Sequence, residues 1–391
     1  MLITREKNIT VLGNGLYLGP VPSGSFSEQV RCCYEQLDGI MSAMNRHVAM
    51  VIYFIYAKTR EEYDSVSAEL DKLHRSAYAS PYSIIAQEPA DGTMVNLEIH
   101  HCCERANPVY GKFEGFPYCT FSYDDNRYLI SGGLRLKDPD AGLQDQSRES
   151  FRLMKGILEK EGMDFSNVFR QWNYIESITG DISGSQRYQI FNDVRSEFYS
   201  TSDFSRGYPA ATGIGMITGG AIIDFLAAIH GEVWPVRNPK QVDAHHYSKE
   251  VLAENELSAN LKKTTPKFER AKAIAFGQEI LLYVSGTAAI KGEQSFARDD
   301  VYRQTLLTID NIEQLTDLTN LRAHGIPLSD ESQAEPVSFK VYIKSPSDVE
   351  KVQAAMNLKF GSMKNVLYLI GDICRPELLM EIEGTYWIGK G

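Results

Sequence analysis

One order of predicted elements appears three times along this chain, and the repeat constrains the fold more than any other feature. In the clearest copy, residues 147–227, an amphipathic helix is followed by a strand through Trp172 and Tyr174, a second helix and two closing strands. Residues 299–384 show the same order, and the N-terminal third shows it more loosely. The second and third copies also begin with paired strands. Three similar units are therefore expected, rather than one large core.

We predict an α+β protein made of units 1–114, 115–231 and 232–391. Each unit would form a mixed sheet with helices on one face, and the units would pack about a pseudo-threefold axis. The first unit is the most degenerate. The third is expected to carry the catalytic site, because its closing strand is the richest in acidic residues.

The composition excludes several classes of function. The net charge of -11 argues against a nucleic-acid surface, which needs a basic footprint. No apolar run reaches the length of about 20 residues that a membrane helix needs, and the N-terminus lacks an apolar signal segment. Six cysteines in 391 residues are typical of free thiols rather than of a disulfide framework, so we expect a cytoplasmic protein.

We expect no cofactor and no metal. The glycines of "ATGIGMITGG" lie between two strands and have the wrong spacing for a dinucleotide loop. The "HHCC" run at 100–103 and the pair His245 and His246 resemble metal ligands. However, successive residues on a strand point to opposite faces and would not converge.

The closing strand of the third copy, in "LLMEIEG" at 378–384, alternates apolar and acidic residues. Glu381 and Glu383 are therefore predicted to share one face. In the first copy Glu98 stands at the place of Glu381, whereas the second copy offers only Asp224. The two carboxylates form either a solvated outer face or a site in which apolar walls raise one pKa, so that the acid can donate a proton.

Basic residues near this strand are candidate anion ligands. Lys364, Cys374 and Arg375 lie close to it in the third copy. Arg187, Tyr188 and Arg195 lie on the second helix of the second copy, where an arginine would either bind a carboxylate with two parallel hydrogen bonds or face solvent.

Several longer segments resemble the chorismatases, a chorismate-cleaving family within the YjgF/RidA-like superfamily. They are "FRQWNYIESITG", "YPAATGIG", "NPKQVDAHHY", "PKFERAKAI", "VSGTAAIKGE" and "GDICRPELLMEIEG". The resemblance covers about residues 115–391. It implies a metal-free enzyme that releases pyruvate from chorismate.

The resemblance also implies roles for individual residues. Glu381 would protonate the methylene carbon of the enolpyruvyl ether, and Cys374 matches a position typical of members that form 3-hydroxybenzoate. Substrate contacts would come from the residues Arg187, Tyr188, Arg195, Tyr247, Gly286, Ala288, Lys364 and Arg375. The expected product is 3-hydroxybenzoate, with 4-hydroxybenzoate or a dihydroxycyclohexadiene carboxylate as alternatives.

Two other functions stay open at this point. A RidA-like imine or enamine hydrolase would need a carboxylate-binding arginine in every unit, yet the second copy has Ala211 near that place. A non-catalytic binding protein of the same fold would have Glu381 paired with a cation and closed off from any pocket. A chain that already contains three units is expected to be a monomer or a weak homo-oligomer.

Overall fold

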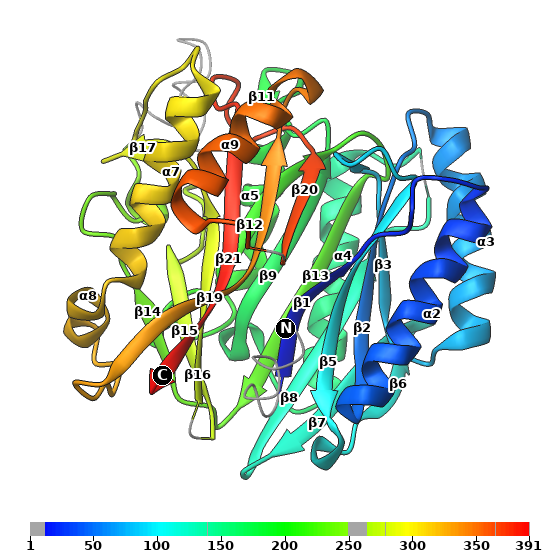
Figure 1. Ribbon diagram of the computed structural model, residues 1–391, viewed down its shortest axis with the longest axis horizontal. Helices are drawn as coiled ribbons and strands as arrows, with labels where there is room; N and C mark the ends of the chain where they lie inside the picture. Colours follow the sequence, from blue (N-terminus) through cyan, green and yellow to red (C-terminus); the bar gives the residue numbers. More distant parts are fainter. Residues whose placement is uncertain (1–11, 139, 249–263, 278, 364, 391) are drawn as a thin grey trace.

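The computed structural model describes residues 12–138, 140–248, 264–277, 279–363 and 365–390. It has a mixed α+β architecture, with three main sheets facing one another in the middle of the molecule and helices on the outside (Figure 1). The part of the chain described contains no helix that combines the length and the apolarity needed to cross a bilayer.

The first sheet has four strands in the order β1-β5-β2-β3 and carries two helices. Its elements are β1 (Leu12–Leu18), α2 (Phe26–Met44), β2 (Arg46–Ile55), α3 (Arg60–Ala77), β3 (Tyr82–Ile85) and β5 (Val95–Cys103). Helix α3 begins with a capping box: the side chain of Thr59 accepts a hydrogen bond from the backbone amide of Glu62, and the carboxylate of Glu62 accepts one from the backbone amide of Thr59.

The second sheet has six strands in the order β12-β9-β13-β8-β7-β6. Its elements are β6 (Val109–Phe113), β7 (Phe116–Tyr123), β8 (Asn126–Leu134), α4 (Leu143–Lys160), β9 (Val168–Glu176), α5 (Arg187–Tyr199), β12 (Ala210–Met216) and β13 (Ala221–Ile229), with the short hairpin β10 (Asp181–Ile182) and β11 (Ser185–Gln186) before α5. Helices α4 and α5 pack together over this sheet.

The third sheet has seven strands in the order β14-β15-β16-β21-β19-β20-β4. Its elements are β4 (Glu88–Pro89), β14 (Val233–Val236), β15 (Ala271–Phe276), β16 (Glu279–Thr287), α7 (Val301–Thr316), α8 (Leu318–Ala323), β19 (Ser332–Ile343), α9 (Val349–Phe360), β20 (Val366–Ile370) and β21 (Met380–Lys390); the hairpin of β17 (Ile290–Lys291) and β18 (Gln294–Ser295) follows β16. Strand β4 comes from the N-terminal part of the chain, so the first and third parts are joined by backbone pairing.

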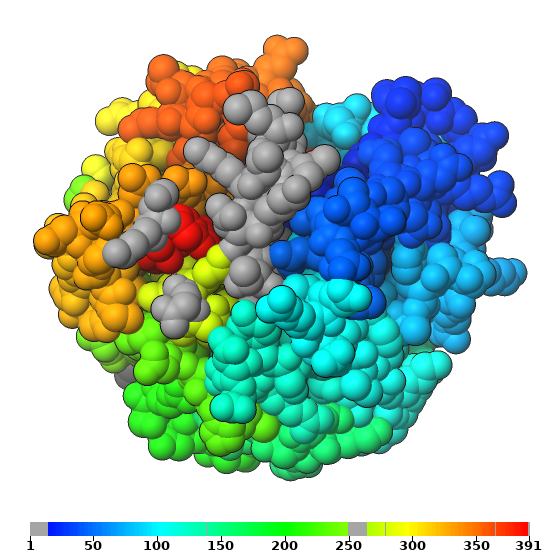
Figure 2. All heavy atoms as spheres, turned by 60° about the horizontal axis from the view of Figure 1, so that its bottom comes forward, coloured from blue at the N-terminus to red at the C-terminus, as the bar shows by residue number. Residues whose placement is uncertain are grey.

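A shared core lies between the sheets. One apolar cluster contains residues from all three sheets, such as Phe54, Trp172 and Tyr342, while separate clusters lie under the helices. Figure 2 shows the N-terminal, middle and C-terminal parts of the chain lying side by side around one face of the molecule. Strand β12 of the second sheet contacts β16 of the third, and the candidate site lies beside this contact.

Candidate functional site

A pocket lies between the second and third sheets, with about 750 Å³ of space not filled by protein atoms, part of it open to solvent. It is formed by the start of α5, the end of β16, the segment before β15 and the segment that leads into β21. Its lining comprises Gln186, Tyr188, Gln189, Asn192, Tyr247, Pro266, Phe268, Arg270, Gly286, Ala288, Ile290, Cys374, Arg375, Leu378 and Glu381.

Glu381 lies at the inner wall of the pocket and is only 4 % exposed. Burial, together with the negative charge of Glu383, raises the pKa of its carboxyl to about 8, against the opposing effect of Arg170. Among the described residues no group forms a hydrogen bond or ion pair with this carboxyl. Glu381 is therefore a buried acid that holds its proton at neutral pH and faces a pocket, contrary to the expectation for a non-catalytic protein.

A bulge in β16 makes room for this carboxyl. The register between β16 and β21 shifts between Val284 and Thr287, and Gly286 lies within the shift. A Cβ atom at Gly286 would stand 1.9 Å from Oε1 of Glu381, which is far too close for any real contact. A side chain at position 286 would therefore displace the carboxyl of Glu381 from this place.

Cys374 lies beside Glu381 on the pocket wall. Burial raises the pKa of its thiol to about 12, and the neighbouring Glu381 adds to this effect. The side chain is therefore a neutral thiol at physiological pH, not a thiolate nucleophile.

Two arginines line the same pocket. Arg270 is 4 % exposed, and its guanidinium carbon lies 5.4 Å from the ring centre of Tyr247 and 5.7 Å from that of Phe268. It donates hydrogen bonds to the Tyr247 hydroxyl (2.7 Å) and the Val242 carbonyl (2.5 Å). Its Nε is buried and has no hydrogen-bond partner among the described residues. Arg375 donates to the Glu293 carbonyl (2.8 Å). Neither arginine forms an ion pair with a carboxylate in the part of the chain that the structure describes, so both can bind an anion.

Seven of the residues predicted from the sequence line this pocket: Tyr188, Tyr247, Gly286, Ala288, Cys374, Arg375 and Glu381. Arg187 does not line it, because its Nε donates to the Glu176 carbonyl at 2.6 Å. Arg195 lies behind the wall, buried against Asn192 and hydrogen-bonded to Tyr188. Lys364 lies outside the described residues.

The sequence reasoning missed the polar residues that α5 and its preceding turn contribute, Gln186, Gln189 and Asn192, as well as Arg270. For Arg270 a signal was present, since it lies within one of the segments that carry the family resemblance. Its role depends on packing against Tyr247, which no local pattern reveals.

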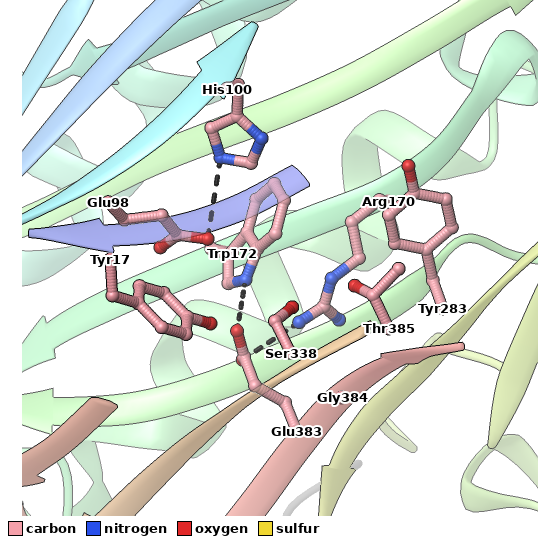
Figure 3. Close-up of a pocket in the computed structure, with 10 residues that line it drawn as sticks. All are labelled: Tyr17, Glu98, His100, Arg170, Trp172, Tyr283, Ser338, Glu383, Gly384 and Thr385. Carbon is pink, nitrogen blue, oxygen red and sulfur yellow. Dashed lines mark hydrogen bonds and ion pairs between the residues drawn. The ribbon is translucent and has the colours of Figure 1, made fainter. Parts of the chain in front are cut away.

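A second, smaller and more enclosed pocket contains most of a buried charge cluster (Figure 3). Glu383 accepts hydrogen bonds from Arg170 and Trp172 of β9, both at 2.8 Å. Lys340 of β19 lies 2.9 Å from Glu383 and 2.6 Å from Glu98. Although burial alone would raise it, Lys340 and Arg170 hold the pKa of Glu383 at about 2. Glu383 is therefore ionised, so the two carboxylates of one strand differ in charge.

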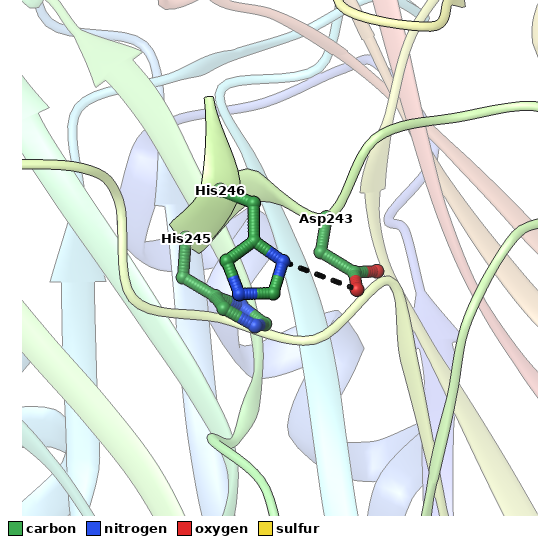
Figure 4. A group of neighbouring side chains, drawn as sticks. All are labelled: Asp243, His245 and His246. Carbon is green, nitrogen blue, oxygen red and sulfur yellow. Dashed lines mark ion pairs between the residues drawn. The ribbon is translucent and has the colours of Figure 1, made fainter. Parts of the chain in front are cut away.

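Asp243, His245 and His246 form a separate group of potential metal ligands (Figure 4). Their donor atoms lie within 4.8 Å of one another, because the histidines belong to a short 3₁₀ turn, Ala244–His246, rather than to a strand. His245 and His246 therefore do converge with Asp243, contrary to the prediction from the sequence, because they do not lie on a strand. The carboxylate of Asp243 is already paired with Arg237 at 3.2 Å.

Comparisons with known proteins place these features in context. A family model described as the N-terminal part of FkbO/Hyg5-like chorismatases matches residues 118–227. The chain is 32 % identical to a 3-hydroxybenzoate synthase of Streptomyces hygroscopicus over 78 % of its own length and 89 % of that protein. It is 31 % identical to a chorismatase of the same organism over 55 % of its length and 60 % of that protein. A solved chorismatase structure shares the fold, with a TM-score of 0.67 and 23 % identity over 86 % of this chain and 92 % of that one.

Proposed function

Because the chain belongs to the chorismatase family, we propose that it releases pyruvate from chorismate, with 3-hydroxybenzoate as the second product. The atoms of chorismate divide between pyruvate and a hydroxybenzoate without consumption of water. One proton enters the side chain at its methylene carbon, and one C–H proton leaves the ring as it becomes aromatic. The dihydrodiol alternative differs by the addition of one water molecule.

Glu381 is the proposed proton donor. Chorismate needs a proton on the methylene carbon before its enolpyruvyl ether can become an oxocarbenium ion and release pyruvate. A donor for this step must hold a proton at neutral pH and face the substrate. Glu381 fulfils both conditions, since its pKa is raised to about 8 and it lines the larger pocket. This observation carries the proposal.

Arg270 and Arg375 are the proposed ligands of the two substrate carboxylates. Both line the pocket, and neither is neutralised by a carboxylate among the described residues. The guanidinium group forms strong paired hydrogen bonds with a carboxylate. This assignment replaces Arg187, which is turned towards a backbone carbonyl, and leaves Arg195 the indirect role of holding Tyr188 and Asn192. Lys364 stays a prediction.

The choice of product is proposed to depend on the shape of the pocket wall around Cys374, Gly286 and Ala288. The Cys374 thiol beside the acid stays neutral and so cannot serve as a base for an attacking water, which favours the outcome without hydrolysis. The similarity of the chain to a 3-hydroxybenzoate synthase, 32 % identity over 89 % of that protein, supports the same product.

Turnover in D₂O tests the proposal. Purified protein is mixed with chorismate, and pyruvate is trapped as lactate by lactate dehydrogenase, which prevents exchange of the methyl group. We expect one deuterium per methyl group and 3-hydroxybenzoate on chromatography. Absence of pyruvate would reject the function, whereas a dihydrodiol would reject only the assignment of the product.

We also propose that units 1–114, 115–231 and 232–391 are three copies of one fold about a pseudo-threefold axis. The positions of the bulges support this: Asp224 and Glu383 each lie opposite a register shift in the neighbouring strand. In β5 the residue opposite the register shift is His100. Glu98 lies two residues before His100, as Glu381 lies two residues before Glu383, so Glu98 and Glu381 are at matching positions. Because β6 joins the second sheet, the predicted boundary after residue 114 is moved to before residue 109. Light scattering after size-exclusion chromatography, at several protein concentrations, distinguishes the expected monomer from a weak homo-oligomer.

A further inference from the structure

Glu383 lies two residues after Glu381 on the same face of β21, so the two side chains leave the strand roughly 7 Å apart. Glu383 does not line the larger pocket. Its carboxylate is instead held by five groups: Arg170 Nη2 (2.8 Å), Trp172 Nε1 (2.8 Å), Thr212 Oγ1 (2.5 Å), Lys340 Nζ (2.9 Å) and the Tyr342 hydroxyl (3.4 Å). Such a group is a fixed negative charge.

Thr212 of β12 connects this fixed charge to the place where Glu381 lies. Its hydroxyl donates to Glu383 and accepts hydrogen bonds from Arg170 Nη2 (2.7 Å) and from the backbone amide of Gly286 (3.1 Å). Gly286 is the bulge residue against which Oε1 of Glu381 packs. The position of the Glu381 carboxyl therefore depends on a hydrogen-bond chain that starts at Glu383.

The charges around Glu381 are unevenly placed. The titratable and charged groups that face it are Glu383 on its own strand, Arg170 on β9, Tyr188 on α5, Cys374 and Arg375 before β21, and Arg270 and Tyr247 across the pocket. Tyr188 and Cys374 are neutral, because burial raises the pKa of both groups. The guanidinium of Arg170 is engaged by Glu383 and Thr212. Burial is the largest cause that disfavours a charge on Glu381, and the fixed anion of Glu383 is the neighbouring charge that adds to it.

We infer that Glu383 is a positioning residue. Its fixed charge adds to the effect of burial in keeping Glu381 in its acid form, and its hydrogen bond to Thr212, continued to Gly286, holds the Glu381 carboxyl towards the pocket. The inference deepens the proposed function, because the proton held in this way is the one given to chorismate. In a purely structural ion-pair cluster, by contrast, the protonation of Glu381 would not respond to changes at Glu383.

The test follows Glu381 without substrate. Infrared difference spectra of the free protein record the protonated carboxyl band that disappears in Glu381→Gln, and its midpoint is measured against pH. Glu383→Gln removes the like charge and should lower the midpoint by about one pH unit or more. Arg170→Gln removes a nearby cation and should raise it. Opposite shifts are not expected from a general loosening of the structure.

A second pair of variants tests whether the Thr212 hydroxyl positions the Glu381 carboxyl. Thr212→Val keeps the shape of the side chain and removes the hydroxyl, and we expect kcat for pyruvate release to fall about tenfold. Thr212→Ser keeps the hydroxyl and should restore most of the rate. Thr305→Val is the matched control, because this buried hydroxyl on α7 bonds to the carbonyl of Val301 and to no other described group, and Thr305 lines neither pocket.

The outcomes separate the two proposals. If wild-type protein releases no pyruvate from chorismate, the proposed function is wrong, but the infrared titration still decides the inference. An unchanged or raised midpoint in Glu383→Gln would overturn the inference even in an active enzyme. Equal rates of Thr212→Val and Thr305→Val would overturn the part played by the hydroxyl.

Discussion

Lys340→Met is expected to be among the most destabilising single changes to the buried charge cluster. Lys340 is fully buried, and its ammonium lies 2.6 Å from Glu98 and 2.9 Å from Glu383. Without it Glu383 keeps Arg170, whereas Glu98 loses the cation that contacts it. A buried carboxylate left in this way carries a large desolvation penalty.

The size of the stability loss follows from leaving Glu98 buried without its cation. Breaking a buried ion pair on one side typically costs about 3–5 kcal/mol in the free energy of unfolding. Because burial already raises the pKa of Glu98, the loss should be partly relieved by proton uptake at low pH. A carboxyl whose pKa is raised in the folded state loses stability as pH rises, so the deficit of Lys340→Met should be larger at pH 8 than at pH 5.

Urea unfolding at both pH values, with a double-mutant cycle, measures the effect. Adding Glu98→Gln to Lys340→Met should recover about 1–3 kcal/mol relative to the sum of the single changes. Lys272→Met is the control: that lysine is also buried, but its ammonium bonds the carbonyls of Gly207 and Tyr208, and its pKa is lowered to about 7 by burial. Additive single effects, or equal losses for the two lysines, would refute this reasoning.

Three further predictions concern turnover. Gly286→Ala should displace the Glu381 carboxyl, lower kcat about tenfold or more and change the product ratio on chromatography. Gly39→Ala is the control: this exposed helical position has no atom within 4 Å of an added Cβ, so kcat and the product ratio should both stay unchanged. The rate of pyruvate release should be level at neutral pH and decline above about pH 8, because only the acid form of Glu381 donates; an increase above pH 8 would contradict this. Arg270→Met should raise KM about 10–100-fold, the value of a charged hydrogen bond, and an unchanged KM would exclude it as a substrate ligand.

Much of the architecture could be predicted from the sequence, because it is encoded locally. The capping pair Thr59 and Glu62 marks the start of α3, and the alternation of β21 correctly puts Glu381 and Glu383 on one face. Patterns of this kind depend on neighbours along the chain, so a single sequence contains them.

The difference between the two carboxylates could not be predicted, because it comes from partners more than 200 residues away. Arg170 and Trp172 reach Glu383 from β9, while no described group pairs with Glu381. Arg270 could not be placed either, because its position in the pocket depends on Tyr247, which lies 23 residues earlier in the chain and outside any local pattern. Long-range packing of this kind leaves no local signal.

The most direct test of the proposed acid compares pyruvate release from chorismate by wild-type protein, Glu381→Gln and Glu159→Gln, an exposed glutamate on α4. Loss of a general acid typically lowers the rate about 10²–10⁴-fold. We predict a loss in this range for Glu381→Gln and an unchanged rate for Glu159→Gln, with both variants folded. A rate for Glu381→Gln close to that of the wild type would contradict the assignment of Glu381 as the proton donor.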